Sequence, residues 1–173
     1  MTILEPPTSP NRSTRFDSLE QEVFLNLWRT YDRLRQFEDE LFGRFELTPQ
    51  QYNALRLLKA SHPAALLTLE LAGKLVSRAP DITRLLDKLA ERGLITRERP
   101  AENRRQVLVQ ITAAGLKLLD QMAEPLRDCH HRQLGHLPAA DLERLAALLK
   151  AARAPHEADG PWAAGAWSEP HCG

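Results

Sequence analysis

Apolar residues recur every three or four positions over most of the chain, and this spacing predicts a mainly α-helical protein. The first such run extends from Leu19 to about Phe45, and Ser18 and Gln21 stand at the spacing of a capping box at its start. The run carries more apolar surface than one core-facing stripe needs, so part of it is expected to contact something other than its own domain.

Capping residues predict the next three helices. Thr48, Pro49 and Gln51 indicate a helix from Pro49 to about Ala60, with Tyr52, Leu55 and Leu58 on its buried face. After a break at His62-Pro63, Thr68 is expected to cap a short helix that ends near Val76. Ser77 is expected to cap the next helix, which has Pro80 in its first turn and stops at Gly93.

A β-hairpin and two further helices complete the predicted order. Strands at Leu94–Arg99 and Gln106–Thr112 flank a polar loop, Pro100–Arg105, with arginines at its tip. Thr112 can cap the following helix, which Pro125 should kink or open locally. Pro138 begins the last helix, and its apolar face ends at Ala152. Residues 1–15 and 154–173 lack this periodicity and are expected to be disordered.

Composition narrows the class of protein. The chain has 173 residues, and its 43% hydrophobic content excludes wholesale disorder. No apolar run approaches the roughly 18 residues of a membrane helix, and the proline-containing N-terminus does not read as a secretory signal. Cys129 and Cys172 form no CxxC pair. We therefore expect a cytoplasmic protein with reduced thiols and no membrane association.

Charge is distributed unevenly although the net charge is zero. Residues 16–50 contain eight acidic and four basic side chains, a local charge of −4. Residues 68–112 contain nine basic and six acidic side chains, a local charge of +3. A basic middle segment permits nucleic-acid binding there without proving it.

The order helix, helix, short helix, turn, helix, hairpin resembles that of the MarR family of bacterial winged helix-turn-helix regulators. The resemblance covers about Leu19 to Ala152 and rests on Leu47–Tyr52, Leu69–Ala72, Ser77–Arg97 and the wing run Asn103–Gly115. It implies a mainly α fold with a small β-hairpin wing. It also divides the chain into a winged helix-turn-helix domain at 47–111 and dimerisation helices at 16–46 and 112–153.

The resemblance also implies which residues meet double-stranded DNA. Ser77–Arg92 would be the recognition helix in the major groove, and the hairpin tip would reach the minor groove. The expected DNA contacts are Ser77, Arg78, Pro80, Asp81, Thr83, Arg84, Lys88, Asn103, Arg104 and Arg105. Asn103 departs from the family, which usually has aspartate there, and so loses a charge that helps to organise the wing. For isolated charges, the alternative is an ordinary solvated helix face or turn.

Ligand and partner expectations follow from the same resemblance. The family implies a homodimer, a pseudo-palindromic operator and a small aromatic or phenolic effector. Phe24, Trp28, Tyr31 and Tyr52 are candidates to line the effector pocket, although aromatic residues at helical spacing are more often plain core. The expected function is a ligand-responsive repressor.

Other functions have weaker support in the sequence. Cys129, His130 and His131 are adjacent, so on a helix they point in different directions and make poor co-ligands. We expect no metal and no cofactor. An enzyme is not expected either, since the chain has no phosphate-binding glycine loop, nucleophile elbow or zincin motif. The alternative function is a winged-helix protein–protein interaction module that does not bind DNA, but the basic recognition helix and wing argue against it.

Overall fold

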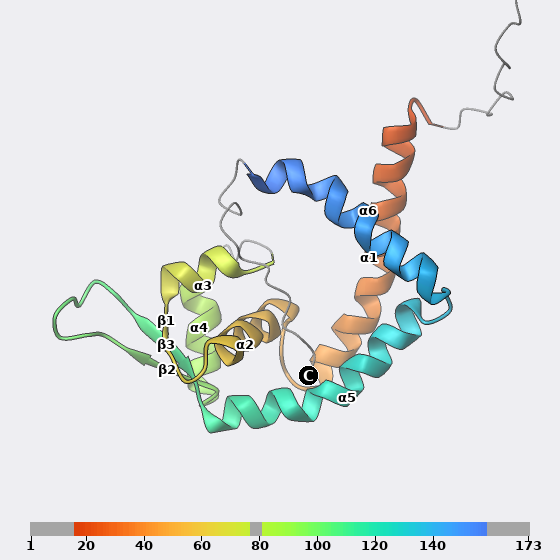
Figure 1. Ribbon diagram of the computed structural model, residues 1–173. Helices are drawn as coiled ribbons and strands as arrows, with labels where there is room; N and C mark the ends of the chain where they lie inside the picture. The colour runs from red at the N-terminus through yellow and green to blue at the C-terminus, as the bar shows by residue number, and fades with distance from the viewer. Residues whose placement is uncertain (1–15, 77–80, 159–173) are drawn as a thin grey trace, which may run out of the picture. The chain divides into compact units, whose positions relative to one another are not determined.

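The computed structural model describes residues 16–76 and 81–158, and it is mostly helical with one small antiparallel sheet (Figure 1). The predicted fold class is confirmed. The elements are α1 (Leu19–Arg44), α2 (Pro49–Ser61), β1 (Leu66–Leu67), α3 (Thr68–Lys74), α4 (Ile82–Glu91), β2 (Ile95–Glu98), β3 (Leu108–Ile111), α5 (Ala113–Leu134) and α6 (Ala139–Ala158). By their contacts, the residues up to Gln36 and those from Phe37 onward form two units, which are described in turn.

The first unit contains the N-terminal part of α1. The Ser18 hydroxyl accepts a hydrogen bond from the Gln21 N–H at 3.2 Å, as the capping-box spacing predicted. The reciprocal bond goes one residue further back, because Gln21 Oε1 accepts from the Asp17 N–H at 2.7 Å. Beyond this cap the helix presents large apolar side chains to solvent, namely Leu19, Val23, Phe24, Leu27, Trp28 and Tyr31.

The core of the second unit is built mainly from leucine side chains. Helix and sheet residues contribute together, and the largest fully buried side chains are Leu55, Leu58, Leu71, Leu75, Leu86, Leu89, Val109 and Met122. Leu55 and Leu58 lie on the predicted buried face of α2. Tyr52, predicted for the same face, is only half-buried and packs its ring 5.0 Å from that of Phe42.

The sheet has the strand order β1-β3-β2, with β3 antiparallel to both neighbours. Ile95 pairs with Ile111 and Leu66 with Val109, so the short β1, which the sequence analysis missed, covers one edge of the hairpin. The predicted capping role of Thr68 is wrong. Its hydroxyl donates instead to the Val107 carbonyl at 3.1 Å, and Leu67 occupies the N-cap position without a side-chain bond.

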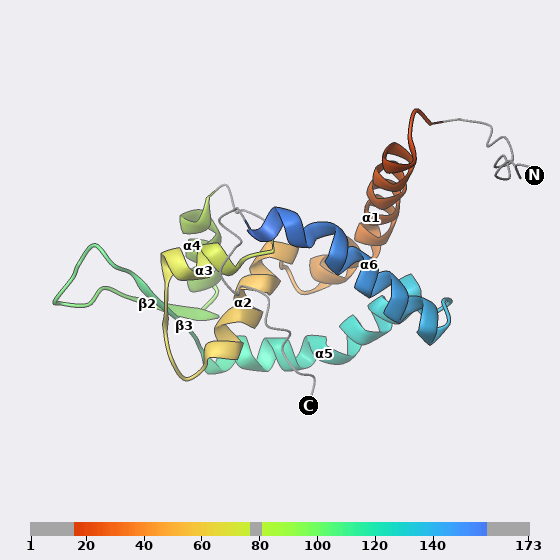
Figure 2. The same ribbon diagram turned by 45° about the horizontal axis from the view of Figure 1, so that its top comes forward.

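The other predicted helix ends are mostly confirmed. Thr48 and Gln51 form a complete capping box at α2, and Thr112 accepts from the Gly115 N–H at the start of α5. Helix α5 continues through Pro125 and changes direction about halfway along its length (Figure 2).

The last helix is longer than predicted. Helix α6 runs to Ala158 and not to residue 153, because it continues through Pro155, and an Arg153–Glu157 ion pair at 3.0 Å spans its last turn. The expectation of disorder is therefore wrong for residues 154–158. The rest of the two segments expected to be disordered, 1–15 and 159–173, lies outside the described residues.

Two helix C-termini have the same hydrogen-bond pattern. At the end of α1, the Leu47 N–H donates to the Phe42 carbonyl and the Glu46 N–H donates to the Gly43 carbonyl. At the end of α4, Leu94 and Gly93 repeat this arrangement on Leu89 and Ala90. Both are Schellman motifs, which need a left-handed residue after the helix. Gly93 adopts it at a φ of 68°, but α1 uses Glu46 at 54°, which costs roughly 1–2 kcal/mol for a residue with a Cβ.

Candidate nucleic-acid interface

Helix α4 is the described part of the expected recognition helix. It begins at Ile82, with Asp81 as its N-cap, and Asp81 Oδ1 accepts from the Arg84 N–H at 2.9 Å. A continuous helix from Ser77 to Arg92 is therefore wrong, since Asp81 has φ −140° and ψ 84°, outside the helical region. Asp81 serves as the cap that the sequence analysis gave to Ser77. Ser77, Arg78 and Pro80 lie outside the described residues.

The two faces of α4 differ sharply in polarity. Leu86 and Leu89 are fully buried, and Ile82 and Leu85 are half-buried against the core. The predicted DNA-contacting residues Thr83, Arg84 and Lys88 are all exposed, as is Asp87. The exposed face of α4 is therefore polar and carries two cations, and its opposite face is packed into the core.

The loop between β2 and β3 forms the wing and extends beyond the sheet (Figure 1). Arg104 and Arg105 are exposed in it, as are their neighbours from Ala101 to Gln106. Asn103 organises the turn: its Oδ1 accepts from the Arg105 N–H at 3.2 Å, and its carbonyl accepts from the Gln106 N–H at 3.0 Å. The Asn103 side chain thus orders the backbone of the turn without a carboxylate charge.

An ion pair connects α4 to the wing. Arg97 on β2 donates through Nη1 to Asp87 Oδ1 on α4. This pair could not be predicted from the sequence, because the residues are ten positions apart on two different elements and no local pattern joins them. The contact ties the exposed face of α4 to the strand that leads into the wing.

Two further contacts hold the C-terminal ends of α3 and α4. Asn53 on α2 accepts the Val76 N–H through Oδ1 at 3.1 Å, just after α3 ends. Arg92, at the C-cap of α4, donates to the Glu46 carbonyl at 2.6 Å and to the Phe45 carbonyl at 3.1 Å. Neither contact was predicted. The candidate interface is therefore connected to α2, to the wing and to the turn that follows α1.

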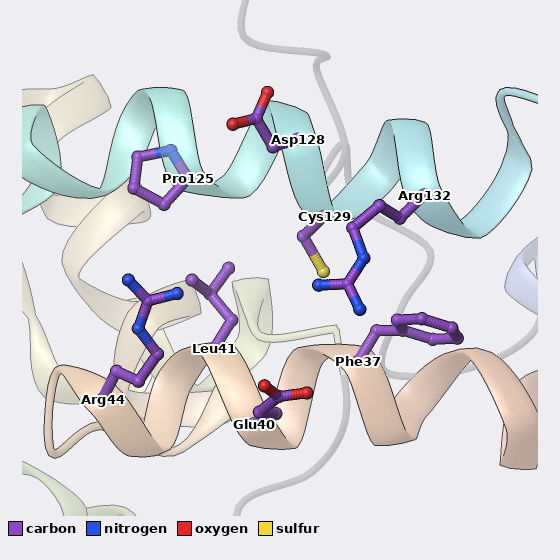
Figure 3. Close-up of a pocket in the computed structure, with 8 residues that line it drawn as sticks. All are labelled: Phe37, Glu40, Leu41, Arg44, Pro125, Asp128, Cys129 and Arg132. Carbon is purple, nitrogen blue, oxygen red and sulfur yellow. The ribbon is translucent and has the colours of Figure 1, made fainter.

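A pocket of about 280 Å³ lies between the C-terminal part of α1 and α5 (Figure 3). It is lined by Phe37, Glu40, Leu41, Arg44, Pro125, Asp128, Cys129 and Arg132. The Arg132 guanidinium carbon lies 5.1 Å from the centre of the Phe37 ring, within cation–π range. Burial raises the pKa of the Cys129 thiol, and the Glu38 carboxylate raises it further.

This lining differs from the predicted one. Tyr52 belongs to the packed core, and burial raises the pKa of its phenol, while Arg56 lowers it. Phe24, Trp28 and Tyr31 belong to the separate first unit, and Phe24 and Trp28 contact each other at 6.2 Å between ring centres. The role of these four side chains in effector binding stays a prediction.

Histidine and cysteine side chains do not gather into a metal site in the described part of the chain. Over residues 16–76 and 81–158, no group of three or more histidine, cysteine, aspartate or glutamate side chains could hold a metal ion. His130 faces Glu38, with Nε2 and Oε1 3.6 Å apart. In the same residues, no helix is both long enough and apolar enough to span a membrane.

Comparisons with known proteins agree with the geometry. The MarR family model matches residues 47–107. A MarR transcription factor of known structure from Planctomyces limnophilus is 55% identical, with 79% of this chain and 99% of that one covered at a TM-score of 0.64. The transcriptional repressor IacR of Pseudomonas putida is 24% identical over 136 residues, covering 78% of this chain and 80% of that protein.

A DNA complex is among the structural neighbours. A mutant Escherichia coli MarR in complex with operator DNA is 23% identical and shows the same fold at a TM-score of 0.67, with 79% of this chain and 99% of that one covered. The 55% identity to the Planctomyces limnophilus protein over almost its full length goes beyond fold. The chain belongs to the MarR family of winged helix-turn-helix, DNA-binding transcriptional regulators.

Proposed function

We propose that the protein is a ligand-responsive repressor that binds a pseudo-palindromic operator as a homodimer. One observation carries the proposal: the exposed polar face of α4, which presents Arg84 and Lys88, is joined through the Asp87–Arg97 ion pair to a strand that leads to a wing with two exposed arginines at its tip. The two surfaces proposed to contact DNA, the exposed face of α4 and the wing, are thereby connected to each other. The operator complex of the Escherichia coli relative supports the same mode of binding.

In this mode, residues 47–111 form the DNA-binding domain. Helix α4 enters the major groove, where Arg84 can pair bidentately with guanine and Thr83 can meet a base edge. Lys88 and the preceding residues Ser77 and Arg78 approach phosphates or bases. Arg104 and Arg105 enter the minor groove, where a narrow groove enhances the negative potential. A protein–protein module would not need cations on both surfaces.

The test is fluorescence anisotropy with a labelled duplex from upstream of the protein's own gene and a scrambled duplex of equal length and composition. We expect clear preference for the upstream duplex and a steep decrease in affinity with salt, about −0.9 in log affinity per log salt for each neutralised phosphate. Arg105→Ala should weaken binding, whereas Arg127→Ala, which removes an exposed arginine of α5, should not.

Three results would contradict the proposal in different ways. Failure to bind either duplex at low salt would favour the protein–protein module. Equal affinity for both duplexes would indicate an architectural DNA binder without sequence preference. If Arg105→Ala binds as tightly as wild type at the same salt concentration, the wing assignment is wrong.

The homodimer is supported by apolar surface that a single chain leaves uncovered. On α1, Phe24, Trp28 and Tyr31 are each more than 60% exposed, and on α6 Leu148 is 60% exposed. The α1 residues recur at spacings of four and three, so they share one face of that helix, and soluble monomers rarely present contiguous apolar patches of this kind. We therefore assign residues 16–46 and 112–153 to dimerisation. A two-fold axis would place the two α4 helices about one DNA turn, roughly 34 Å, apart. Sedimentation equilibrium at micromolar concentration tests this, and a folded monomer contradicts it.

Ligand control is supported by the pocket in Figure 3, where Phe37 offers an aromatic surface and the cations Arg44 and Arg132 lie beside the carboxylates of Glu40 and Asp128. A small aromatic or phenolic effector matches that chemistry. Coupling of about 1–3 kcal/mol between effector and operator would lower operator affinity roughly 5- to 150-fold. Aromatic carboxylates and phenols can be screened by thermal shift and then by anisotropy. A compound that stabilises the protein without changing DNA affinity would contradict coupling for that compound.

A further inference from the structure

Arg92 connects the C-terminal end of α4 to the turn after α1, which lies more than 40 residues earlier in the sequence. Its two terminal nitrogens donate to consecutive carbonyls, Nη1 to Glu46 at 2.6 Å and Nη2 to Phe45 at 3.1 Å. The Glu46 carboxylate contributes little, since its Oε2 lies 4.0 Å from Nη2 and its side chain is 85% exposed. The guanidinium therefore holds the backbone of the turn and not its side chain.

The turn that Arg92 holds is suited to receive a cation. Phe45 and Glu46 follow α1 directly, so their carbonyls lie close to the negative end of the helix dipole. Hydrogen bonds from a charged donor are stronger than neutral ones, and the planar fork of arginine matches two acceptors at once. Glu46 also adopts the left-handed conformation that the neighbouring motif gives to glycine, at a φ of 54°. Strained residues of this kind persist where surrounding contacts hold them.

The position of Arg92 relative to α4 and β2 also suits this role. It is the C-cap of α4, and β2 begins three residues later at Ile95, so it sits at the junction of the recognition helix and the wing. On the other side of the contact, Leu41 and Arg44 of α1 line the pocket in Figure 3, and Phe45 follows Arg44. The contact thus connects the end of α1 to the element that would read DNA.

We propose that Arg92 is a positioning residue for DNA binding: it sets the placement of α4 against the end of α1 and does not itself contact DNA. This inference rests on the proposed DNA-binding function. Without the guanidinium, α4 would keep its core face but lose its attachment to the turn after α1. Its exposed face would then be less well placed for the groove.

The experiment uses the full chain and compares three variants with wild type. Arg92→Met removes the donors and keeps the stem, Arg92→Lys keeps the charge but not the two-pronged geometry, and Glu46→Gln removes only the distant ion pair. Binding of the upstream duplex is measured by anisotropy across a salt series, at a temperature at which all four proteins are folded by circular dichroism. Hydrogen–deuterium exchange without DNA measures the exchange rates of the backbone amides of α4, with those of α5 as a reference.

We expect Arg92→Met to bind roughly 2- to 30-fold more weakly, the range typical of residues that act on coupling without touching the ligand. The slope of log affinity against log salt should equal that of wild type. Arg92→Lys should fall between the two, and Glu46→Gln should match wild type. Amides of α4 should exchange faster in Arg92→Met, and those of α5 should not.

Three results would overturn the proposal. A folded Arg92→Met with wild-type affinity would show that the contact only stabilises the fold. A salt slope shallower by about 1.8, one phosphate in each half of a dimer, would show that Arg92 contacts DNA directly. Unchanged exchange in α4 would show that the contact does not hold the helix. If wild type itself binds no duplex, the proposed function fails, and the exchange result still decides whether Arg92 holds α4.

Discussion

Gly115→Ala should destabilise the protein by about 2 kcal/mol, although alanine normally favours helices. Gly115 lies in the first turn of α5, where an added Cβ would stand 2.4 Å from the Leu94 carbonyl oxygen and 2.7 Å from Ile111 Cγ1. The carbonyl cannot easily move, since it already accepts the Thr112 N–H at 3.1 Å. Overpacking of this kind costs about 1–3 kcal/mol, and contact with backbone places it near the upper end. The helix-propensity gain offsets up to about 1 kcal/mol.

Gly73→Ala is the matched control. Gly73 is also helical, in α3, but an added Cβ there meets nothing within 4 Å. It should therefore stabilise the protein by up to about 1 kcal/mol. For a chain of this size, 1 kcal/mol corresponds to roughly 2–4 °C in melting temperature, so Gly115→Ala should melt about 4–8 °C lower than wild type. Melting is measured by circular dichroism at one fixed protein concentration, because dimerisation would make it concentration-dependent. A Gly115→Ala protein that melts at or above the wild-type temperature would refute the packing argument.

Three further predictions concern a cap, a thiol and the dimer. Thr112→Val removes the hydroxyl that accepts from the Gly115 N–H and donates to the Gly93 carbonyl, and should cost about 1–2 kcal/mol in urea unfolding, whereas Thr112→Ser should lose much less. Burial raises the pKa of Cys129, so at a given pH the native thiol should react with iodoacetamide more slowly than the urea-unfolded one; equal rates by mass spectrometry would contradict this. The same raised pKa contributes stability below the ordinary thiol pKa, and this contribution should be lost as the pH rises through the raised value. Leu148→Asp should shift sedimentation toward the monomer without unfolding the chain, because the side chain is exposed in one chain; an unchanged dimer would exclude Leu148 from the interface.

Features that depend on a few neighbouring residues could be predicted from the sequence. The capping boxes and caps at Thr48 and Thr112 each involve residues within three positions, and both formed as expected. The wing could also be predicted, because the alternation of apolar and polar side chains in β3 and the polar loop before it are local patterns. The order of the predicted elements then indicated the MarR family, and with it the winged helix-turn-helix fold.

Features that depend on tertiary contacts could not be predicted in this way. Thr68 has the chemistry of a cap, but the carbonyl of Val107, 39 positions away and just before β3, accepts a hydrogen bond from its hydroxyl. Ser77 and Asp81 are both good caps by residue type, and only the backbone of Asp81 shows which one begins α4. Arg92 looked like one more charge on a basic helix, since nothing near it in sequence indicates the carbonyls 46 and 47 positions away.

The Asp87–Arg97 ion pair has a consequence for how binding sites could vary in evolution. Because it ties α4 to β2, this pair would help to keep a constant separation between the two surfaces that are proposed to read DNA. Within each half of an operator, the number of base pairs between the positions read by α4 and by the wing would then be constant. In the proposed homodimer, the spacing between the two halves would depend on a different part of the protein, the helices that we assign to dimerisation. Operators of related proteins should therefore diverge in half-site spacing sooner than in the layout of a single half-site.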